Sequence, residues 1–227
     1  MAGTMIEFPV DGGVAPGYLA LPEMTPAPGV VVIQEWWGLE PHIKDVVERF
    51  ATAGFVALAP DLYHGEVATE PNEAQKLAME LDYGRAISEI DAAAAYLIGR
   101  SETRGEKVGV VGFCMGGGLS LLTACRSNRI GGAVVFYGRN PSPIEQVRDL
   151  ACPLLGLYGE ADQGIPPAEV ERLRAALEAA GGKQYELHIY PNAPHAFFND
   201  TRSSYRPDAA TDAWQRTLAF FREHLAA

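Results

Sequence analysis

The segment Lys107–Gly117, KVGVVGFCMGG, decides the fold of this chain. Its first five residues, Lys107–Val111, predict a short buried strand, and Gly118–Cys125 predicts a buried helix that follows it. Between them a Gly-x-Cys-x-Gly sequence is centred on Cys114. Glycines on both sides of one cysteine indicate a turn so tight that side chains would collide, with strained backbone at its centre.

A strand that turns sharply into a helix around a nucleophile is the nucleophile elbow of α/β-hydrolases. The first N–H groups of the helix and its positive dipole end point at that side chain, which favours a thiolate and later an oxyanion. Most such enzymes have serine at this place, whereas this chain has Cys114. We therefore predict Cys114 as the nucleophile. A purely structural cysteine is the alternative.

Length and composition indicate one globular α/β domain spanning residues 1–227, with 48% hydrophobic and 21% charged residues. The net charge of −11 argues against nucleic acids and anionic membranes as partners. Three cysteines without regular spacing do not form a disulfide framework. We find no signal-like first segment and no apolar run of roughly 18 residues, so a cytoplasmic location is expected. A monomer is the simplest expectation for the oligomeric state.

Apolar runs alternate with helical patterns along the whole chain. Strands are predicted at Met5–Val10, Val14–Leu21, Gly29–Ile33, Phe55–Ala59, Lys107–Val111, Gly132–Tyr137, Leu154–Tyr158 and Tyr185–Tyr190. Helices are predicted at His42–Ala53, from Glu73, at Ile87–Leu97, Gly118–Cys125, Pro167–Ala180 and Thr211–Leu225, with a loop or short helix at Asn140–Asp149. This alternation predicts a mostly parallel, twisted sheet with helices on both faces, an α/β-hydrolase fold.

Three chemically matched residues each follow a predicted strand: Cys114, Asp162 and His195. The carboxyl ends of parallel strands lie at one edge of a sheet, so we expect these side chains to meet there. Nucleophile, acid and histidine come in the α/β-hydrolase order. A thiol of pKa about 8.5 needs a base to become a thiolate near neutral pH, and an imidazole oriented by a carboxylate provides one. The alternatives are a helix N-cap for Asp162 and a loop histidine bonded to backbone for His195.

Glu35 is a further candidate, because it ends a strand beside the elbow and precedes two tryptophans. Its carboxylate can accept the thiol proton, or hold it until substrate arrives; a surface glutamate is the alternative. By the logic of the elbow, the backbone N–H groups of Trp36 and Met115 are the expected oxyanion donors.

Aromatic residues that follow the strand ends are candidates for the substrate pocket: Trp37, Tyr63, Tyr137 and Phe197. Each of these four residues can equally be a packing residue. Cys125 and Cys152 are expected in the core. The other histidines, His42, His64, His188 and His224, are expected at solvent-exposed or capping positions. No His, Cys and Asp group has the spacing of metal ligands, so we expect no metal.

Taken together, these residues resemble the dienelactone hydrolase family. The matching segments, in chain order, are Gln34–Leu39, Ala59–Tyr63, Gly112–Gly117, Phe136–Gly138, Tyr158–Asp162 and Pro194–Phe197. The resemblance implies a triad of Cys114, His195 and Asp162, with Glu35 switching the thiol to a thiolate when substrate enters. It also implies the Trp36 and Met115 amides as the oxyanion hole. The family reaction opens dienelactone with water to maleylacetate during the breakdown of chlorinated aromatics, and it needs no cofactor.

The chain departs from this pattern in its arginines. The enzymes that act on dienelactone hold the substrate carboxylate with two arginines, one of them just after the catalytic histidine. Here Asn199 stands where that arginine is sought, and the segment Thr69–Asp82 contains Lys76 but no arginine. Arg85 and Arg202 lie nearby in sequence and can substitute. Asparagine cannot form the bidentate pair of arginine with a carboxylate, so hydrolase chemistry is predicted more firmly than this substrate.

Two other functions are compatible with the same residues. One is a broad-specificity carboxylesterase without lactone activity. The other is a non-catalytic binding module or thiol sensor on the same fold, in which Cys114 oxidises readily.

Overall fold

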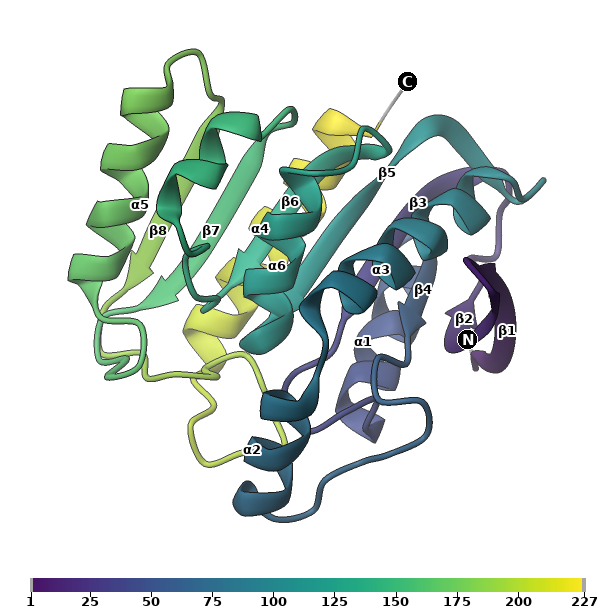
Figure 1. The fold of residues 1–227 in the computed structure, drawn as a ribbon, viewed down its shortest axis with the longest axis horizontal. Coiled ribbons are helices and arrows are strands. Elements are labelled where there is room, and N and C mark those ends of the chain that lie inside the picture. Colours follow the sequence, from purple (N-terminus) through teal and green to yellow (C-terminus); the bar gives the residue numbers. More distant parts are fainter. Residues whose placement is uncertain (1, 226–227) are drawn as a thin grey trace.

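The computed structural model describes residues 2–225 and builds them around one eight-stranded sheet (Figure 1). The strands are β1 Thr4–Val10, β2 Gly13–Ala20, β3 Ala27–Ile33, β4 Val56–Pro60, β5 Thr103–Phe113, β6 Ile130–Phe136, β7 Leu154–Gly159 and β8 Tyr185–Tyr190. Their order across the sheet is β1-β2-β4-β3-β5-β6-β7-β8. β2 is antiparallel to both β1 and β4, and the pairs from β4 to β8 are parallel. The predicted mixed, mostly parallel sheet is therefore confirmed.

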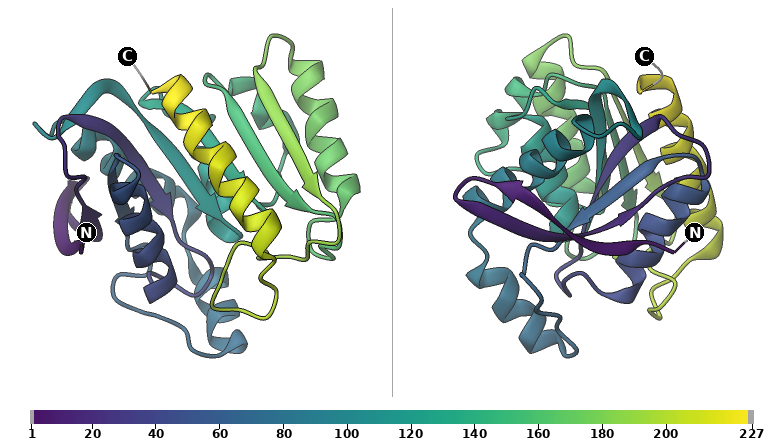
Figure 2. Two further views of the ribbon diagram at one scale, coloured as in Figure 1. Left: turned by 180° about the vertical axis from the view of Figure 1, so that it is seen from behind. Right: turned by 90° about the vertical axis from the view of Figure 1, so that its right-hand side faces the viewer.

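Helices cover both faces of this sheet. They are α1 Pro41–Thr52, α2 Pro71–Glu80, α3 Tyr83–Ile98, α4 Met115–Ala124, α5 Pro167–Ala180 and α6 Pro207–His224, with a 3-10 helix at Ile144–Asp149. α3, α4 and α5 lie on the face seen in Figure 1, and α1 and α6 lie on the opposite face seen in Figure 2. None of the helices within residues 2–225 combines the length and the hydropathy needed to cross a bilayer.

Each sheet face has its own hydrophobic core, and β3 shows how one strand contributes to both. Val31 and Ile33 belong to the core under α3, α4 and α5, whereas Val30 and Val32 belong to the core under α1 and α6. All four side chains are fully buried. Because successive side chains of a strand point to opposite faces, a strand covered on both sides must be apolar throughout. The uninterrupted apolar run of β3 follows from this burial.

The position of β5 explains where the polar loops gather. β5 lies between β3 and β6 in the parallel part of the sheet, so the carboxyl ends of β3, β5, β6, β7 and β8 face the same way. The loop after β8 and helix α2 extend beyond this edge, at the bottom of Figure 1. The residues after these strands are therefore brought to one rim of the molecule.

All eight predicted strands and all six predicted helices are present, and the differences lie at their ends. β5 begins at Thr103 rather than Lys107, because its first residues pair with β3 while their side chains are mostly exposed and polar. α4 begins at Met115, directly after the elbow, rather than at Gly118. α6 begins at Pro207 rather than Thr211, with proline at a first-turn position where no N–H is needed.

Candidate active site

Cys114 occupies the turn between β5 and α4, with φ of 54° and ψ of −114°. Positive φ is costly for a residue with a side chain and persists only where the surroundings enforce it. A Cβ on Gly112 would lie 1.9 Å from the carbonyl oxygen of Gly116, and a Cβ on Gly116 would lie 2.4 Å from that of Gln34. Both contacts are with backbone, so glycine is required at both positions. The turn has the geometry of a nucleophile elbow.

The structure brings Cys114, His195 and Asp162 together at the rim. His195 Nε2 lies 3.1 Å from Cys114 Sγ, and His195 Nδ1 lies 2.6 Å from Asp162 Oδ2. The imidazole therefore bridges sulfur and carboxylate through its two nitrogens. This is the arrangement in which a histidine can take a thiol proton while a carboxylate fixes its orientation.

The carboxylate of Asp162 is fixed by backbone hydrogen bonds as well as by His195. Its Oδ1 accepts hydrogen bonds from the backbone N–H groups of Gly164 and Ile165, at 2.8 and 2.9 Å. The N-cap of α5 is Pro166, so Asp162 does not cap that helix. One carboxylate oxygen is thus occupied by the loop, and the other faces His195.

The pKa values of His195 and Asp162 are both shifted by their surroundings. Burial lowers the pKa of His195, but the hydrogen bonds to Asp162 and Cys114 and the negative charge of both partners outweigh it and raise that pKa to about 10. For Asp162, burial raises the pKa, but His195 and the N–H groups of Ile165 and Gly164 bring it below its ordinary value. Both shifts favour an imidazolium paired with an ionised Asp162.

We expect Cys114→Ala to lower the pKa of His195, because the sulfur contributes a hydrogen bond and a charge that raise it. The measurement is an NMR titration of the His195 ring in both proteins. In the wild type the folded-state pKa is above the ordinary value of 6.5. The stability gained from protonation is therefore complete below about pH 6.5, declines as pH rises and is lost above about pH 10. An unchanged His195 pKa in the variant would mean that the sulfur carries no charge there.

The predicted oxyanion donors belong to two segments that lie against each other. Met115 is the first residue of α4, and the close approach of Gly116 to the Gln34 carbonyl sets the Trp36 loop against the start of this helix. The Tyr63 hydroxyl bridges the two, because it lies 3.2 Å from the Trp36 carbonyl oxygen and 3.5 Å from Met115 Sδ. Within residues 2–225, neither the Trp36 nor the Met115 backbone N–H donates a hydrogen bond. Both N–H groups therefore remain available to an oxyanion.

Glu35 is buried beside this site, but its carboxyl group is bonded elsewhere. Asn199 Nδ2 donates to its Oε2 at 2.8 Å, and the Tyr137 hydroxyl donates to its Oε1 at 3.3 Å. Burial raises the pKa of Glu35 above its ordinary value, although the hydrogen bond from Asn199 opposes the shift. In the part of the chain that the structure describes, no hydrogen bond joins Glu35 to Cys114. The expected role of Glu35 in switching the thiol stays a prediction.

The predicted pocket residues fall into two groups. Trp37 is partly exposed and lies beneath the Arg202 guanidinium at 4.0 Å, and Tyr63 is nearly buried. Tyr137 and Phe197 have no exposed surface, and their rings pack against each other at 5.4 Å. Substrate contact with Tyr137 or Phe197 would therefore require the site to open.

The two arginines proposed as substitutes already have partners. Arg85 pairs with Glu89 at 3.5 Å. Arg202 pairs with Glu40 at 3.3 Å and covers Trp37, so it is the one that contacts a predicted pocket residue.

The remaining cysteines and histidines lie apart from this site, and one expectation for them is wrong. Cys125 and Cys152 are buried, and burial raises the pKa of their thiols to about 11 and about 12. His42 was expected at a solvent-exposed or capping position, but it is buried near Phe198, 3.3 Å from Asp200. Burial lowers the pKa of His42. Across residues 2–225, no three His, Cys, Asp or Glu side chains are grouped to hold a metal ion.

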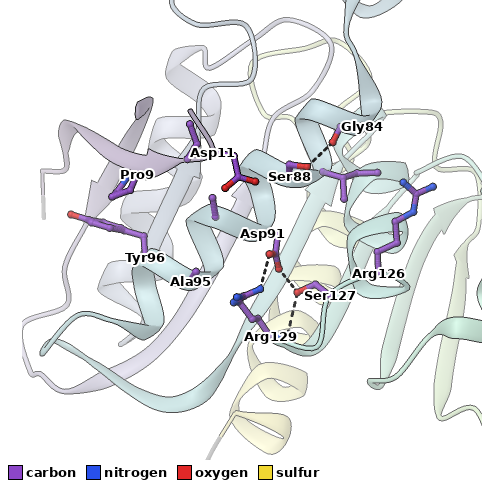
Figure 3. A pocket seen from close by; sticks show the side chains of 13 residues that line it. Pro9, Asp11, Gly84, Ser88, Asp91, Ala95, Tyr96, Arg126, Ser127 and Arg129 are labelled. Atoms are coloured by element: carbon purple, nitrogen blue, oxygen red, sulfur yellow. Dashed lines mark hydrogen bonds and ion pairs between the residues drawn. The ribbon is translucent and has the colours of Figure 1, made fainter. Parts of the chain in front are cut away.

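A separate groove of about 710 Å³ lies along α3, beside the β1–β2 hairpin (Figure 3). Asp91 accepts hydrogen bonds there from Ser127 and from Arg129, the latter at 2.7 Å. None of the predicted site residues lines this groove. Asp91 and Arg129 pair with each other, and the lining residues make the groove distinct from the rim that holds Cys114.

Comparisons with known proteins agree with this geometry. The model of a family described as the dienelactone hydrolase family matches residues 15–225. A protein of Methylorubrum extorquens named "Putative carboxymethylenebutenolidase" is 38% identical over 96% of this chain and 80% of its own length. Protein usf of Aquifex pyrophilus is 37% identical over 98% of this chain and 99% of its own length. A crystal structure titled "Putative Dienelactone Hydrolase" from Klebsiella pneumoniae superposes with a TM-score of 0.90 and 34% identity, covering 97% of this chain and 98% of its own.

Proposed function

The chain belongs to the dienelactone hydrolase family and is an ester or lactone hydrolase, and we propose that it works through an acyl intermediate on Cys114. The observation that supports this most directly is the bridge of His195 between Cys114 Sγ, at 3.1 Å, and Asp162, at 2.6 Å. A thiol, a base and a carboxylate in this order are the parts that nucleophilic acyl transfer requires.

In the first half of the proposed reaction, Cys114 Sγ attacks the carbonyl carbon of the substrate while His195 Nε2 holds the thiol proton. The new C–S bond converts the carbonyl oxygen into an oxyanion, which accepts hydrogen bonds from the Trp36 and Met115 N–H groups. The carbonyl then re-forms and the bond to the ester or ring oxygen breaks. That oxygen takes the proton from His195, which leaves a thioester on Cys114.

In the second half, water attacks the thioester and gives a proton to His195. The second oxyanion uses the same two N–H groups, because it forms on the same oxygen. Its collapse breaks the C–S bond, releases the carboxylic acid and returns the sulfur to its pairing with His195. Asp162 keeps Nδ1 of His195 oriented throughout, and no cofactor takes part in these steps.

We propose a small ester or enol-lactone as the substrate, bound with less dependence on a substrate carboxylate than in an arginine-bearing site. At the position four residues after His195, the Asn199 amide carries no charge and is already bonded to Glu35. Arg85 and Arg202 are each paired with a glutamate. Ring opening of dienelactone, as the family resemblance implies, remains within the proposed class. The net charge of −11 supports a small-molecule partner rather than a nucleic acid, and a cytoplasmic monomer is proposed with it.

Mass spectrometry of the protein with a slowly hydrolysed ester tests this proposal. We expect the acyl mass on the peptide that contains Cys114, and turnover of p-nitrophenyl acetate and of neutral lactones alongside dienelactone. The buried thiols Cys125 and Cys152, whose raised pKa keeps them protonated, should stay unlabelled in the same sample.

The same experiment distinguishes the thiol-sensor alternative. A sensor would give a sulfenic acid on Cys114 under mild peroxide but no acylation and no turnover. An acyl group found on a residue other than Cys114 would contradict the proposed nucleophile.

A further inference from the structure

Asn199 has its amide held in one orientation in a fully buried position. Its Oδ1 accepts two hydrogen bonds from Thr201, from the backbone N–H at 3.0 Å and from Oγ1 at 2.6 Å. An amide oxygen engaged by two donors leaves the NH₂ group for the other side. That group donates to Glu35 Oε2 at 2.8 Å. The contact is therefore directional, with Asn199 as donor and Glu35 as acceptor.

This hydrogen bond joins two loops that carry different parts of the site. Glu35 directly precedes Trp36, one of the two expected oxyanion donors, and Asn199 lies four residues after His195. The same two loops are also joined by a half-buried contact, in which Arg202 pairs with Glu40. The hydrogen bond between Glu35 and Asn199 is the fully buried contact of the two. If one partner is removed, bulk water cannot take its place.

Glu35 is surrounded by groups that respond to its ionisation. Tyr137 follows β6, His195 belongs to the loop after β8, and Glu40 precedes α1. Burial and the charge of Glu40 raise the pKa of Glu35, while Asn199, His195 and Tyr137 lower it. The pKa remains above its ordinary value, because burial outweighs the contacts that lower it.

We propose, resting on the hydrolase function above, that Asn199 is a positioning residue that acts through Glu35. Its amide holds the Glu35 carboxyl group beside Tyr137 and turned away from the sulfur, and so fixes the Trp36 loop relative to the His195 loop. An oxyanion donor and a base act together only when their separation is held to within about 0.5 Å. Loosening this bond should therefore affect the chemical step more than substrate binding.

The sharpest test is Asn199→Asp, which keeps the shape and both Thr201 hydrogen bonds but replaces the donor facing Glu35 with an acceptor. Two carboxyl groups at this distance must share a proton or repel each other. We expect kcat for a small activated ester to fall about tenfold at pH 8, with KM changed less than about twofold. The loss should shrink as the pH falls, because a proton shared by the two carboxyl groups removes their repulsion, and this step should be missing from the wild-type pH profile.

Combining Asn199→Asp with Glu35→Gln tests whether Asn199 acts through Glu35. In the Glu35→Gln background, the new amide can donate to the aspartate introduced by Asn199→Asp, which restores a hydrogen bond of reversed polarity. We therefore expect Asn199→Asp to change kcat less than about twofold in that background. The rate of Cys114 alkylation by iodoacetamide should fall by the same factors as kcat in the two backgrounds. This measurement needs no turnover.

Asn140→Asp is the matched control, because Asn140 Nδ2 likewise donates to a glutamate, Glu169, at 3.2 Å. It should carry a smaller stability cost, because Asn140 is only half-buried, and an unchanged pH profile. Should Asn199→Asp fail to fold, Asn199→Ala gives the second variant, with the same expected loss of kcat but no new pH dependence. Equal losses in both Glu35 backgrounds, or a wild-type kcat in the Asn199 variants, would overturn the role of Asn199. These outcomes leave the proposed function standing, since that function fails on different results: no turnover by the wild type, or acylation of a residue other than Cys114.

Discussion

Cys114→Ala is expected to lower kcat/KM for small activated esters by at least about 10⁴-fold while leaving the fold intact. The bond-forming atom is removed, and the oxyanion donors and binding contacts that remain provide only residual catalysis. Because a methyl group replaces a small thiol at a partly exposed position, little packing is lost. Steady-state kinetics and a thermal melt of the same preparation measure the two effects.

Cys125→Ala and Cys152→Ala are the controls for this result. Both thiols are buried in the core under α3, α4 and α5, so these variants should lose some stability but keep the activity of the folded fraction. Full turnover by Cys114→Ala would refute the acyl-cysteine mechanism. Equal loss of activity in all three variants would show that general destabilisation, rather than the missing nucleophile, is being measured.

Gly112→Ala is expected to lower the free energy of unfolding by at least about 3 kcal/mol, the largest structural effect that we predict. The added Cβ would lie 1.9 Å from the Gly116 carbonyl oxygen and 2.2 Å from its carbonyl carbon. Backbone cannot rotate away as a side chain can, so β5 and α4 would have to separate at the elbow. Urea denaturation, or the amount of folded protein recovered, measures the effect.

Gly99→Ala is the matched control for the elbow substitution. Gly99 ends α3 with φ of −75°, and its added Cβ would come no closer than 3.5 Å to another atom. We expect a change within about 0.5 kcal/mol at that position. A Gly112→Ala protein as stable as wild type would mean that the elbow is looser than these contacts indicate.

The sheet could be predicted from the sequence because its strands have strong signals. β3 and β4 are buried on both faces, which leaves apolar runs, and the glycines around Cys114 mark the elbow. Once the strand order along the chain is known, the rule for carboxyl ends places Cys114, Asp162 and His195 at one rim. The first residues of β5 gave no such signal, because they are polar and paired only at their backbone.

The contacts between loops could not be predicted in the same way. The sequence marks Asn199 only as the place of a missing arginine, and nothing local indicates that its amide meets Glu35, 164 residues away. The burial of His42 depends on Phe198 and Asp200, which come from the far end of the chain. Phe197 and Tyr137 follow strand ends as pocket residues do, but the packing of their rings leaves both without exposed surface. Such pairings are decided by tertiary structure rather than by a periodic pattern.

The order in which the site residues leave the ribosome follows from their positions in the chain. Cys114 precedes His195 by 81 residues, so β8 and the loop after it are synthesised after the elbow. A nascent chain that has emerged only through β7 holds the sulfur without its base. Its thiol then has no imidazole beside it, so under the proposed mechanism ester hydrolysis has to wait until the loop after β8 has been synthesised and folded.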